Sequence, residues 1–379
     1  MKVLLLSAYD ADSHQSWRKG LATAFSDWEW TVLTLPPRYF SWRIRGNSLT
    51  WAMEQRSLLE RPYDLLIVTS MTDLSALRGF VPSLASLPTI VYFHENQFGY
   101  PNSDKAHSSV EPQVLNLYTA LCADHILFNS AYNRDTFLAG VEALLKRLPD
   151  HVPKNIRPSI EKRASVLPVP LADSCYGHAR LSERERQALW GDASSSERAA
   201  LAAPIKLLWA ARWEYDKGPD LLLAILDSLQ AQKIDFRLCL LGQTFRQYPE
   251  AFDQIRERFQ PQLVQYGYEE SGERYRQWLV SADVVLSTAL HEFQGLAVLE
   301  AMAAGCRPAL PKRLAYPEWV SEDFLYDVGG LSLERQAENA LELILSLGRK
   351  ELSVEIPDLS WSQLKSQYAD VFHSVVEAS

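Results

Sequence analysis

Short runs of apolar residues alternate with longer amphipathic stretches along most of the sequence. The first series of predicted strands comprises Val3–Ser7, Thr31–Leu35, Leu65–Ser70, Thr89–His94, His125–Ser130 and Ser165–Val169. The predicted helices between them include Ser16–Phe25, Trp51–Leu59, Gln113–Ala123 and Tyr132–Arg147. Because strands and helices alternate, the pattern predicts the α/β fold class, with parallel sheets built from strand–helix units.

A polar segment, residues 181–203, separates this series from a second one. The second series of predicted strands comprises Lys206–Ala211, Phe236–Gly242, Leu263–Gly267, Val284–Thr288 and Pro308–Pro311. Its predicted helices include Pro219–Gln232, Tyr248–Phe259, Glu273–Ser281, Leu296–Ala304, Leu333–Leu347 and Trp361–Val376. A chain of 379 residues is too long for one ordinary hydrophobic core. We therefore expect two doubly wound, Rossmann-like domains that face each other across a cleft.

The changes in pattern also set the expected domain limits. We predict an N-terminal domain over residues 1–180, a linker over 181–203 and a C-terminal domain over 204–358. Residues 359–379 are predicted to form a final helix that packs back on the N-terminal domain.

The composition, 47% hydrophobic and 22% charged, is that of an ordinary globular protein. The formal net charge of −9 argues against general attraction to nucleic acid. The acidic excess lies after residue 170, however, so the first half can still carry local basic patches. The four cysteines are scattered without a CxxC motif and indicate reduced thiols in a cytoplasmic protein. The apolar runs are too short for a signal peptide or a membrane span.

Cations and acids follow two predicted strands of the second series. Arg212 and Lys217 come after the first of these strands, and Glu292 lies in the loop before a helix that contains Glu300. That helix is predicted to begin near Gly295. Ligands of open α/β sheets bind at the carboxyl ends of the strands, and a helix N-terminus suits a phosphate group. Surface cations and two solvated acids are the simpler interpretation of each motif alone; together, the motifs favour a diphosphate site.

Polar side chains also follow strands of the first series. His94, Glu95, Asn96 and Gln97 end one predicted strand. Further polar residues begin the helices after two other strands: Ser13, His14, Asn129, Ser130 and Asn133. Helix capping by Ser13 and a strand-end histidine in a turn are the structural alternatives. Four consecutive polar residues at a sheet edge favour a site for a polyhydroxyl acceptor.

One basic segment interleaves cations with aromatic residues. It runs Arg38-Tyr-Phe-Ser-Trp42-Arg43-Ile-Arg45, a pattern suited to stacking on unpaired bases and contacting phosphates. A second basic segment spans residues 146–163. Taken alone, each segment is more simply explained as a solvated surface.

These motifs resemble a known family. Arg212…Lys217-Gly and Glu292-x7-Glu300 resemble the donor-site signature of retaining GT-B glycosyltransferases of the family-4 type. The stretch 91–101, with Ser13-His14 and the residues 128–133, is similar to a narrower group, the tRNA-queuosine mannosyltransferase-like proteins. The resemblance implies a GT-B fold, an N-terminal domain for the tRNA acceptor and a C-terminal domain for a nucleotide-sugar donor.

The resemblance also implies the reactants. The donor would be GDP-mannose and the acceptor the cyclopentenediol of queuosine in a tRNA anticodon. No metal, other cofactor, membrane or obligate protein partner is implied. One departure from the family pattern is that Ala11 and Asp12 stand where many family-4 enzymes carry a glycine pair, so close approach of that backbone to a phosphate is not assured.

The residue roles follow from the same resemblance. Arg212 and Lys217 would bind the diphosphate, Glu300 the ribose and Glu292 the transferred sugar, while His94 would face the reacting centre. The implied catalytic residues are His94, Arg212, Lys217 and Glu292. The implied donor-binding residues are Arg212, Lys217, Glu292, Phe293, Gln294, Gly295, Leu296 and Glu300. The implied acceptor-binding residues are Ser13, His14, Glu95, Asn96, Gln97, Asn129, Ser130 and Asn133. Candidate RNA contacts are Arg38, Trp42, Arg43 and Arg45.

Two other functions remain open on the sequence. One is a related glycosyltransferase with a small-molecule or lipid-linked acceptor, and the other is a protein that binds a nucleotide sugar without transferring it. The complete set of Arg212, Lys217, Glu292 and Glu300 argues against the second, and the basic-aromatic segment argues against the first. We expect transfer with retention, by front-face attack.

Overall fold

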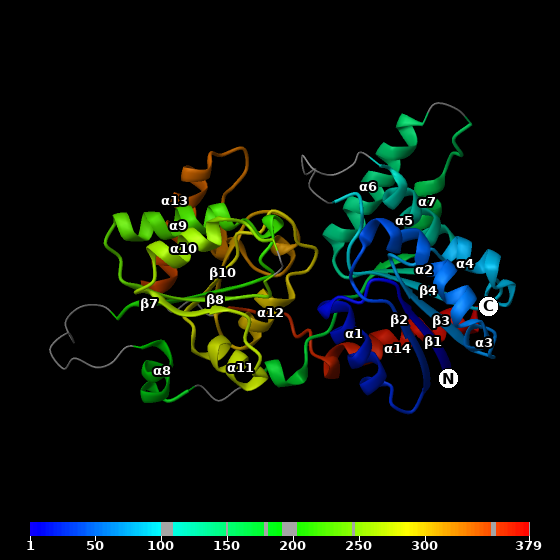
Figure 1. Cartoon of the computed structure of the whole chain (residues 1–379), viewed down its shortest axis with the longest axis horizontal. Coiled ribbons are helices and arrows are strands. Elements are labelled where there is room, and N and C mark those ends of the chain that lie inside the picture. Colours follow the sequence, from blue (N-terminus) through cyan, green and yellow to red (C-terminus); the bar gives the residue numbers. More distant parts are fainter. Residues whose placement is uncertain are drawn as a thin grey trace. The chain divides into compact units, whose positions relative to one another are not determined.

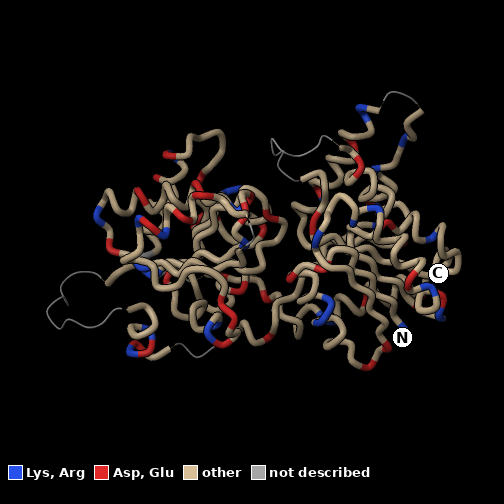
Figure 2. The backbone as a smooth tube through the Cα atoms, in the orientation of Figure 1, with Lys and Arg blue, Asp and Glu red and all other residues tan. Residues whose placement is uncertain are grey.

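The computed structural model describes residues 1–99, 109–148, 151–177, 181–191, 203–244, 247–349 and 354–378. The chain forms two compact units (Figure 1). The first unit contains residues 1–170 and 359–379, and the second contains residues 171–358. Figure 2 shows basic and acidic positions interspersed through the described part of both units. No helix among the described residues is long and apolar enough to cross a membrane.

The first unit contains one parallel sheet. Its strands are β1 (Lys2–Ser7), β2 (Glu29–Thr34), β3 (Leu65–Thr69), β4 (Thr89–Phe93), β5 (His125–Phe128) and β6 (Ala164–Val166). Its helices are α1 (Asp12–Ala24), α2 (Phe40–Glu54), α3 (Arg56–Leu59), α4 (Leu74–Phe80), α5 (Glu111–Cys122), α6 (Ala131–Arg147), α7 (Ile156–Glu161) and α14 (Trp361–Glu377), with the 3-10 turn η1 (Pro82–Leu84).

The strand order of this sheet among the described residues is β2-β1-β3-β4-β5-β6. The central strands β3 and β4 are buried along their whole length, as expected when helices cover both faces. Figure 1 shows α2, α4 and α5 on one face and α1 and α14 on the other. The order reverses between β1 and β3, so the loops after these two strands meet at the switch point, and the loop after β4 lies at the same edge of the sheet, beside the loop after β3.

The second unit repeats this architecture. Its strands are β7 (Ile205–Ala210), β8 (Phe236–Leu241), β9 (Leu263–Gly267), β10 (Val284–Leu286), β11 (Arg307–Pro311) and β12 (Leu325–Tyr326). Its helices are α8 (Glu183–Trp190), α9 (Pro219–Ala231), α10 (Ala251–Arg258), α11 (Gly272–Ser281), α12 (Leu296–Ala303) and α13 (Leu333–Arg349). Its 3-10 turns are η2 (Asp173–Cys175), η3 (Tyr215–Lys217), η4 (Tyr316–Glu318) and η5 (Glu322–Phe324).

The order of the described strands in the second sheet is β12-β11-β10-β7-β8-β9, with all registered pairs parallel. Figure 1 shows α9, α10 and α13 on one face of this sheet and α11 and α12 on the other. The order reverses between β7 and β10, which are hydrogen-bonded neighbours. The loops that follow these two strands therefore meet at the switch point, the usual position of a ligand in an open α/β sheet.

The described part of the predicted linker contains a helix that packs on the second unit. Helix α8 lies within residues 181–203 and belongs to the second unit. Trp190 is fully buried, and its indole Nε1 donates to Ser281 Oγ at 2.8 Å. Arg186 pairs with Asp283 at 2.5 Å. Trp190 attaches α8 to the second unit. The sequence around it is polar, so the hydropathy pattern does not indicate this buried contact.

Helix α2 begins eleven positions earlier than the helix expected at Trp51, because Phe40 already lies in its first turn. The basic-aromatic segment therefore straddles the start of a helix. Its N-cap residue, Tyr39, has a left-handed backbone with φ of 54°. The first turns of α2 mix cations with aromatic residues, so their apolar positions do not follow the spacing from which a helix is predicted.

The final helix, α14, packs within the first unit. Trp17 on α1 donates its indole N–H to Tyr368 on α14 at 3.1 Å. A β-carbon at Gly20 would lie 2.4 Å from the ring of Trp361, so only glycine admits this close packing of α1 and α14. The C-terminal segment thereby completes the core of a unit whose other residues end at 170.

Candidate functional site

The loops after β7 and β10 are locked together by their main chains. The carbonyl of Asp216 accepts hydrogen bonds from the N–H groups of Leu290 and His291, at 2.8 and 3.1 Å. Thr288 Oγ1 donates to the carbonyl of Lys217 at 2.8 Å. Gly218 has φ of +66°, and a β-carbon there would lie 2.0 Å from the carbonyl oxygen of Thr288. Glycine is therefore required where the two loops cross.

Lys217 lies at the centre of these interlocked loops, with its side chain only 8% exposed. Its ammonium group donates to the carbonyl of His291 at 2.9 Å and to Glu292 Oε2 at 3.1 Å, and lies 3.2 Å from Asp216 Oδ2. The ammonium group thus makes two hydrogen bonds and one further ion-pair contact, with Asp216. Asp216 was not predicted as a site residue, although it directly precedes the predicted lysine in sequence.

Burial and charge oppose each other at this ion pair. Burial by itself would lower the pKa of Lys217, but Glu292 and Asp216 outweigh it and raise the pKa above its usual value. Burial would likewise raise the pKa of Glu292, but Lys217, with smaller effects of His291 and Arg212, lowers the pKa below the ordinary range. Both groups are therefore charged near neutral pH.

Arg212 lies nearer the solvent than Lys217. Its side chain is 46% exposed and pairs with Glu214 at 2.9 Å. An exposed pair of this kind contributes little to stability and can rearrange at low cost. Two cations therefore follow β7, as expected from the sequence: Lys217 is buried and held in place, and Arg212 is exposed and can change its partner.

Glu300 lies on α12, and its carboxylate accepts a hydrogen bond from the hydroxyl of Tyr275 on α11 at 2.8 Å. Burial raises the pKa of Glu300 above its ordinary value, an effect that the bond from Tyr275 only partly offsets. Tyr275 was not predicted, because nothing in its local sequence indicates that α11 lies beside α12.

Gly295 precedes α12 with φ of +84°, which confirms the predicted start of the helix. The side chains of Phe293 and Gln294 are buried, with 4% and 2% of their surface exposed. A ligand can therefore contact mainly the main chain of this segment. The N–H groups of the first helical turn are available for such contacts because they lack partners within the helix. Leu296, the first helical residue, is half-buried.

Three residues that the sequence analysis did not predict support the loop after β10. Arg313 donates to the carbonyls of Ala289 and Thr288, at 2.9 and 3.4 Å. The hydroxyl of Tyr316 lies 2.6 Å from Ser287 Oγ, and that of Tyr326 donates to the Ser287 carbonyl at 2.6 Å. Because β11 and β12 follow in the sheet order, their ends reach this loop, which sequence spacing alone cannot reveal.

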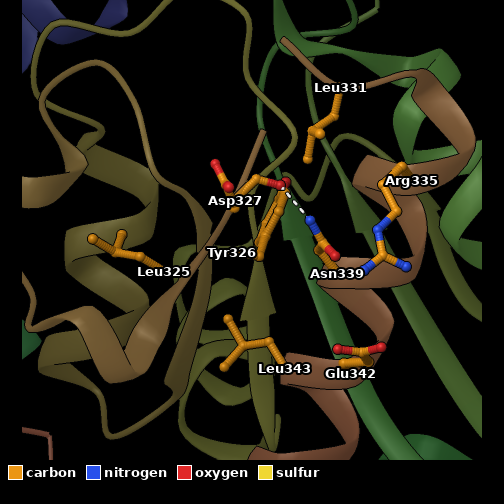
Figure 3. Close-up of a pocket in the computed structure, with 8 residues that line it drawn as sticks. All are labelled: Leu325, Tyr326, Asp327, Leu331, Arg335, Asn339, Glu342 and Leu343. Atoms are coloured by element: carbon orange, nitrogen blue, oxygen red, sulfur yellow. Dashed lines mark hydrogen bonds between the residues drawn. The ribbon is translucent and has the colours of Figure 1, made fainter. Parts of the chain in front are cut away.

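A cavity of about 450 Å³ lies elsewhere in the second unit, beside β12 and α13. Figure 3 shows its lining residues Leu325, Tyr326, Asp327, Leu331, Arg335, Asn339, Glu342 and Leu343. The amide of Asn339 donates to the carbonyl of Asp327 at 2.9 Å across this cavity. None of the predicted donor residues lines it, so it is separate from the loops after β7 and β10.

In the first unit, His94 is packed among aromatic rings at the end of β4. Its ring centroid lies 4.0 Å from that of His14, 4.7 Å from that of Tyr92 and 4.9 Å from that of Trp17. Its Nε2 atom is buried and has no hydrogen-bond partner among the described residues. Burial, with a smaller effect of His14, lowers the pKa of His94 well below its usual value, so the imidazole is neutral at pH 7.

The aromatic rings around His94 are themselves fixed by α14. The hydroxyl of Tyr368 receives the indole N–H of Trp17, lies 3.4 Å from the hydroxyl of Tyr92, and donates to the carbonyl of Pro168 at 3.0 Å. Tyr92 donates to the carbonyl of Leu167 at 2.8 Å. The C-terminal helix therefore holds the rings that enclose His94.

The buried imidazole predicts a pH dependence of stability. In the unfolded chain His94 takes up a proton below about pH 6.5, whereas the folded state resists protonation. Folded-state stability should therefore fall as the pH drops below 6.5, by about 1 kcal/mol from this group between pH 7.5 and 5.5. His94→Phe should flatten the fall in melting temperature over this range. The exposed His373→Phe is the control; an equally steep fall in His94→Phe would contradict the prediction.

The loop after β1 differs in detail from the expectation. Helix α1 begins at Asp12 with Ala11 as its N-cap, so Ser13 does not cap it. Ser13 is half-buried, and its Oγ lies 3.5 Å from His14 Nδ1. The loop is held by an unpredicted bidentate pair, in which Arg18 donates to both carboxylate oxygens of Asp10.

Four predicted acceptor-binding residues instead form a buried network. Asn133 donates to the carbonyl of Phe93 and to Asn129 Oδ1, and Asn129 donates to the carbonyl of His94, all at 2.8–2.9 Å. Asn96 donates to Asn133 Oδ1 at 2.8 Å. These asparagines and Ser130, which caps α6, are at most 4% exposed. Their polar atoms bond to the chain itself, so they hold the loop after β4 in place.

In the loop after β4, the predicted residues Glu95 and Gln97 are half-buried. The main-chain N–H of Gln97 donates to Oδ1 of Asn116 on α5 at 2.8 Å, and this bond attaches the loop after β4 to α5. Tyr100 and Pro101, part of the motif that carried the narrower resemblance, lie outside the described residues.

The candidate RNA contacts fall into two groups. Arg43 is only 8% exposed. Arg45 pairs with Asp73 at 2.9 Å and with Glu111 at 2.7 Å, and its side chain remains 44% exposed. Arg38 is exposed, and Trp42 keeps 56% of its surface exposed. In the second basic segment, Lys146 and Arg157 both pair with Glu142.

Comparison with known proteins places this geometry in a family. Residues 2–171 match the family described as tRNA-queuosine alpha-mannosyltransferase N-terminal, and residues 204–342 match glycosyl transferases group 1. The chain is 33% identical over 325 residues to the tRNA-queuosine alpha-mannosyltransferase of Drosophila melanogaster, over 86% of this chain and 83% of that protein. The chain belongs to the tRNA-queuosine alpha-mannosyltransferase family. As a member of this family it is a glycosyltransferase, and the first unit corresponds closely to the family-specific match.

Solved structures confirm the fold expected for the family. Anabaena HepE in complex with UDP matches with a TM-score of 0.64 and 14% identity, over 99% of this chain and 100% of that one. Sucrose-phosphate synthase from Thermosynechococcus elongatus matches with a TM-score of 0.66 and 14% identity, over 100% of both chains. A glycosyltransferase from Rickettsia africae matches with a TM-score of 0.62 and 12% identity, over 100% and 99%. The two parallel sheets with helices on both faces are thus those of the GT-B fold.

Proposed function

We propose that this protein transfers mannose from GDP-mannose to the cyclopentenediol of queuosine in a tRNA anticodon, with retention of configuration. The observation that carries the proposal is family membership, since the Drosophila relative bears the name of this activity. The buried Lys217–Glu292 pair beside β7 and β10 supports it, because its charges suit a sugar diphosphate.

The donor binds, in this proposal, at the switch point of the second sheet. Arg212 and Lys217 hold the diphosphate, and Glu300 holds the ribose hydroxyls with Tyr275 beside it. Glu292 binds hydroxyls of the mannose. Lys217 already contacts Glu292, Asp216 and the His291 carbonyl, so a bound phosphate oxygen shares the ammonium group with these neighbours.

The chemical step breaks the bond between the anomeric carbon of mannose and the diphosphate oxygen. A hydroxyl oxygen of the cyclopentenediol forms the new bond on the same face, and its proton passes to the leaving phosphate oxygen. GDP and mannosylated queuosine are the products. Negative charge grows on the leaving diphosphate, where Arg212, Lys217 and the N-terminus of α12 stabilise it. These groups supply positive charge without a metal or another cofactor.

The acceptor is placed in the first unit. The residues that contact the acceptor are, in this proposal, Ser13, His14, Glu95 and Gln97. His94 faces the reacting carbon, and its neutral imidazole can accept a hydrogen bond from an acceptor hydroxyl. The buried asparagine network supports this assignment by fixing the loop that carries these residues. The four free cysteines fit a cytoplasmic enzyme, the compartment that we propose.

Incubation of the protein with GDP-mannose and queuosine-containing tRNA tests the proposal directly. We expect the anticodon nucleoside to gain the mass of one hexose by mass spectrometry. The matched control is the same tRNA with guanine in place of queuosine, which should gain none. Transfer from another nucleotide sugar would overturn the donor assignment. A gain of no hexose from any donor would overturn the acceptor and favour a small-molecule or lipid-linked acceptor, or binding without transfer.

A further inference from the structure

Trp42 is largely exposed although its indole lies close to the backbone of its own helix. The side chain is 56% exposed although it lies on the backbone of its own helix. A β-carbon at Gly46, one helical turn later, would lie 2.2 Å from Trp42 Cε2 and 2.6 Å from Trp42 Nε1. Gly46 is therefore buried beneath the ring. The indole thus lies against the helix at Gly46, while more than half of the surface of Trp42 remains exposed.

Other exposed aromatic residues lie within three positions of Trp42 in the sequence. Tyr39 is 74% exposed, and the guanidinium of Arg38 lies over its ring, 5.7 Å from the centroid. Phe40 is 36% exposed and contacts Tyr9 edge to face, with ring centroids 6.1 Å apart. Four exposed residues at the start of α2 form what we call the aromatic platform: Arg38, Tyr39, Phe40 and Trp42.

The platform is continuous with the loop assigned to the acceptor. Tyr9 belongs to the loop between β1 and α1, the loop that leads to Ser13 and His14. The contact of Phe40 with Tyr9 therefore joins the platform to this loop. A chain that places one nucleotide beside His14 could extend its neighbouring nucleotides over the platform.

The chemistry of the platform favours unpaired nucleobases as its occupant. Every base has an aromatic face, and stacking on exposed aromatic side chains is the usual way in which proteins hold unpaired RNA. Arg38 adds a cation that can contact a phosphate or stack. Acidic and basic positions are interspersed through the described part of both units (Figure 2), so attraction of phosphates by itself is a weak basis for holding a tRNA.

We propose that Trp42, supported by Gly46, together with Arg38 and Tyr39, stacks the unpaired loop bases that flank the acceptor nucleotide of the tRNA. This inference rests on the proposed tRNA acceptor and adds the surface that recognises it. It assigns Gly46, which no sequence motif indicated, and gives a stacking role to Tyr39, an aromatic residue of the basic-aromatic segment. It does not draw on Arg43, which is buried, or on Arg45, whose guanidinium already pairs with Asp73 and Glu111.

The test measures binding of queuosine-containing tRNA to the full chain without donor, by fluorescence anisotropy at fixed salt. Trp42→Ala should weaken binding about 5- to 150-fold, the range for loss of one stacked base, whereas Trp42→Phe should retain most of the affinity. The control is Tyr118→Ala, which removes an exposed aromatic residue of α5 that is 49% exposed. Its binding should stay within twofold of the wild type.

Gly46→Ala supplies an independent variant. Alanine favours a helix more than glycine does, so α2 should persist, but the new β-carbon must displace the indole. Gly46→Ala should therefore weaken tRNA binding in the wild type and have no further effect in the Trp42→Ala background. Additive losses in the double variant would contradict a shared mechanism.

Two further measurements separate stacking from charge and from other partners. Arg38→Ala should lower the slope of log Kd against log salt by about one, whereas Trp42→Ala should leave the slope unchanged. An anticodon stem-loop should compete with tRNA far better than a fully paired RNA of the same length. Equal competition by the duplex, or unchanged binding in Trp42→Ala, would overturn the proposal. Because binding is measured without donor, failure of mannose transfer in the enzymatic assay would not be mistaken for failure of the platform.

Discussion

Lys217→Ala is expected to lower the turnover number about 10²- to 10³-fold. The ammonium group lies at the switch point of the second sheet, only 8% exposed, and is held by Glu292 and Asp216. Its removal takes away positive charge where the leaving diphosphate gains negative charge. It also leaves two neighbouring carboxylates without their cation, so the variant should bind GDP more weakly and melt at a lower temperature.

A second lysine provides the matched control for this variant. Lys312 pairs with Glu322 at 2.7 Å, but both side chains are largely exposed. Lys312→Ala should leave both turnover and melting temperature nearly unchanged, since exposed pairs contribute little. Turnover is measured with GDP-mannose and queuosine-containing tRNA, and folding by circular dichroism at the assay temperature. Turnover within threefold of the wild type in folded Lys217→Ala protein would remove this lysine from the mechanism.

Gly218→Ala is expected to lower turnover about 10²-fold, although the change adds a single methyl group. The left-handed backbone of Gly218 costs an alanine about 1–2 kcal/mol. In addition, the new β-carbon would lie 2.0 Å from the carbonyl oxygen of Thr288, so the two loops must move apart. A displacement of about 1 Å among groups that position a substrate is enough for a loss of this size.

The control for Gly218 separates backbone strain from the displacement of the loops. Gly191 has nearly the same backbone, with φ of +67°, and a β-carbon there would meet no atom within 4 Å. Gly191→Ala should therefore lower the melting temperature modestly and leave turnover intact. Both variants are assayed for turnover and for affinity for GDP. Equal turnover in the two variants would show that the crossing of the loops does not position the donor.

The sequence predicted most of the fold because its evidence is local. Apolar runs of strand length alternate with helical periodicity, and that pattern requires no knowledge of distant contacts. The start of α12 after Gly295 was predicted to within a residue for the same reason. The start of α2 was missed, because exposed aromatic residues and cations at Phe40 and Trp42 interrupt the expected periodicity.

The predicted sites were recovered unevenly for a related reason. The sequence shows which polar residues directly follow a predicted strand, so both Lys217 and Glu292 were predicted as site residues, and the structure pairs them. The sequence does not show which other residues contact them. Asn96 and Asn133 were predicted to contact the acceptor, but a polar residue at a strand end can equally bond to the chain, and the structure places both in a buried network.

By itself, the sequence determined that this protein alternates strands and helices in two series and carries cations and acids at the strand ends of the second. Only the tertiary structure decided which of these residues meet. Lys217 and Glu292 are 75 positions apart and form an ion pair because β7 lies beside β10 in the sheet. Strand order is a property of the folded chain, set by the packing of helices on both faces of the sheet, and no local pattern of residues encodes it.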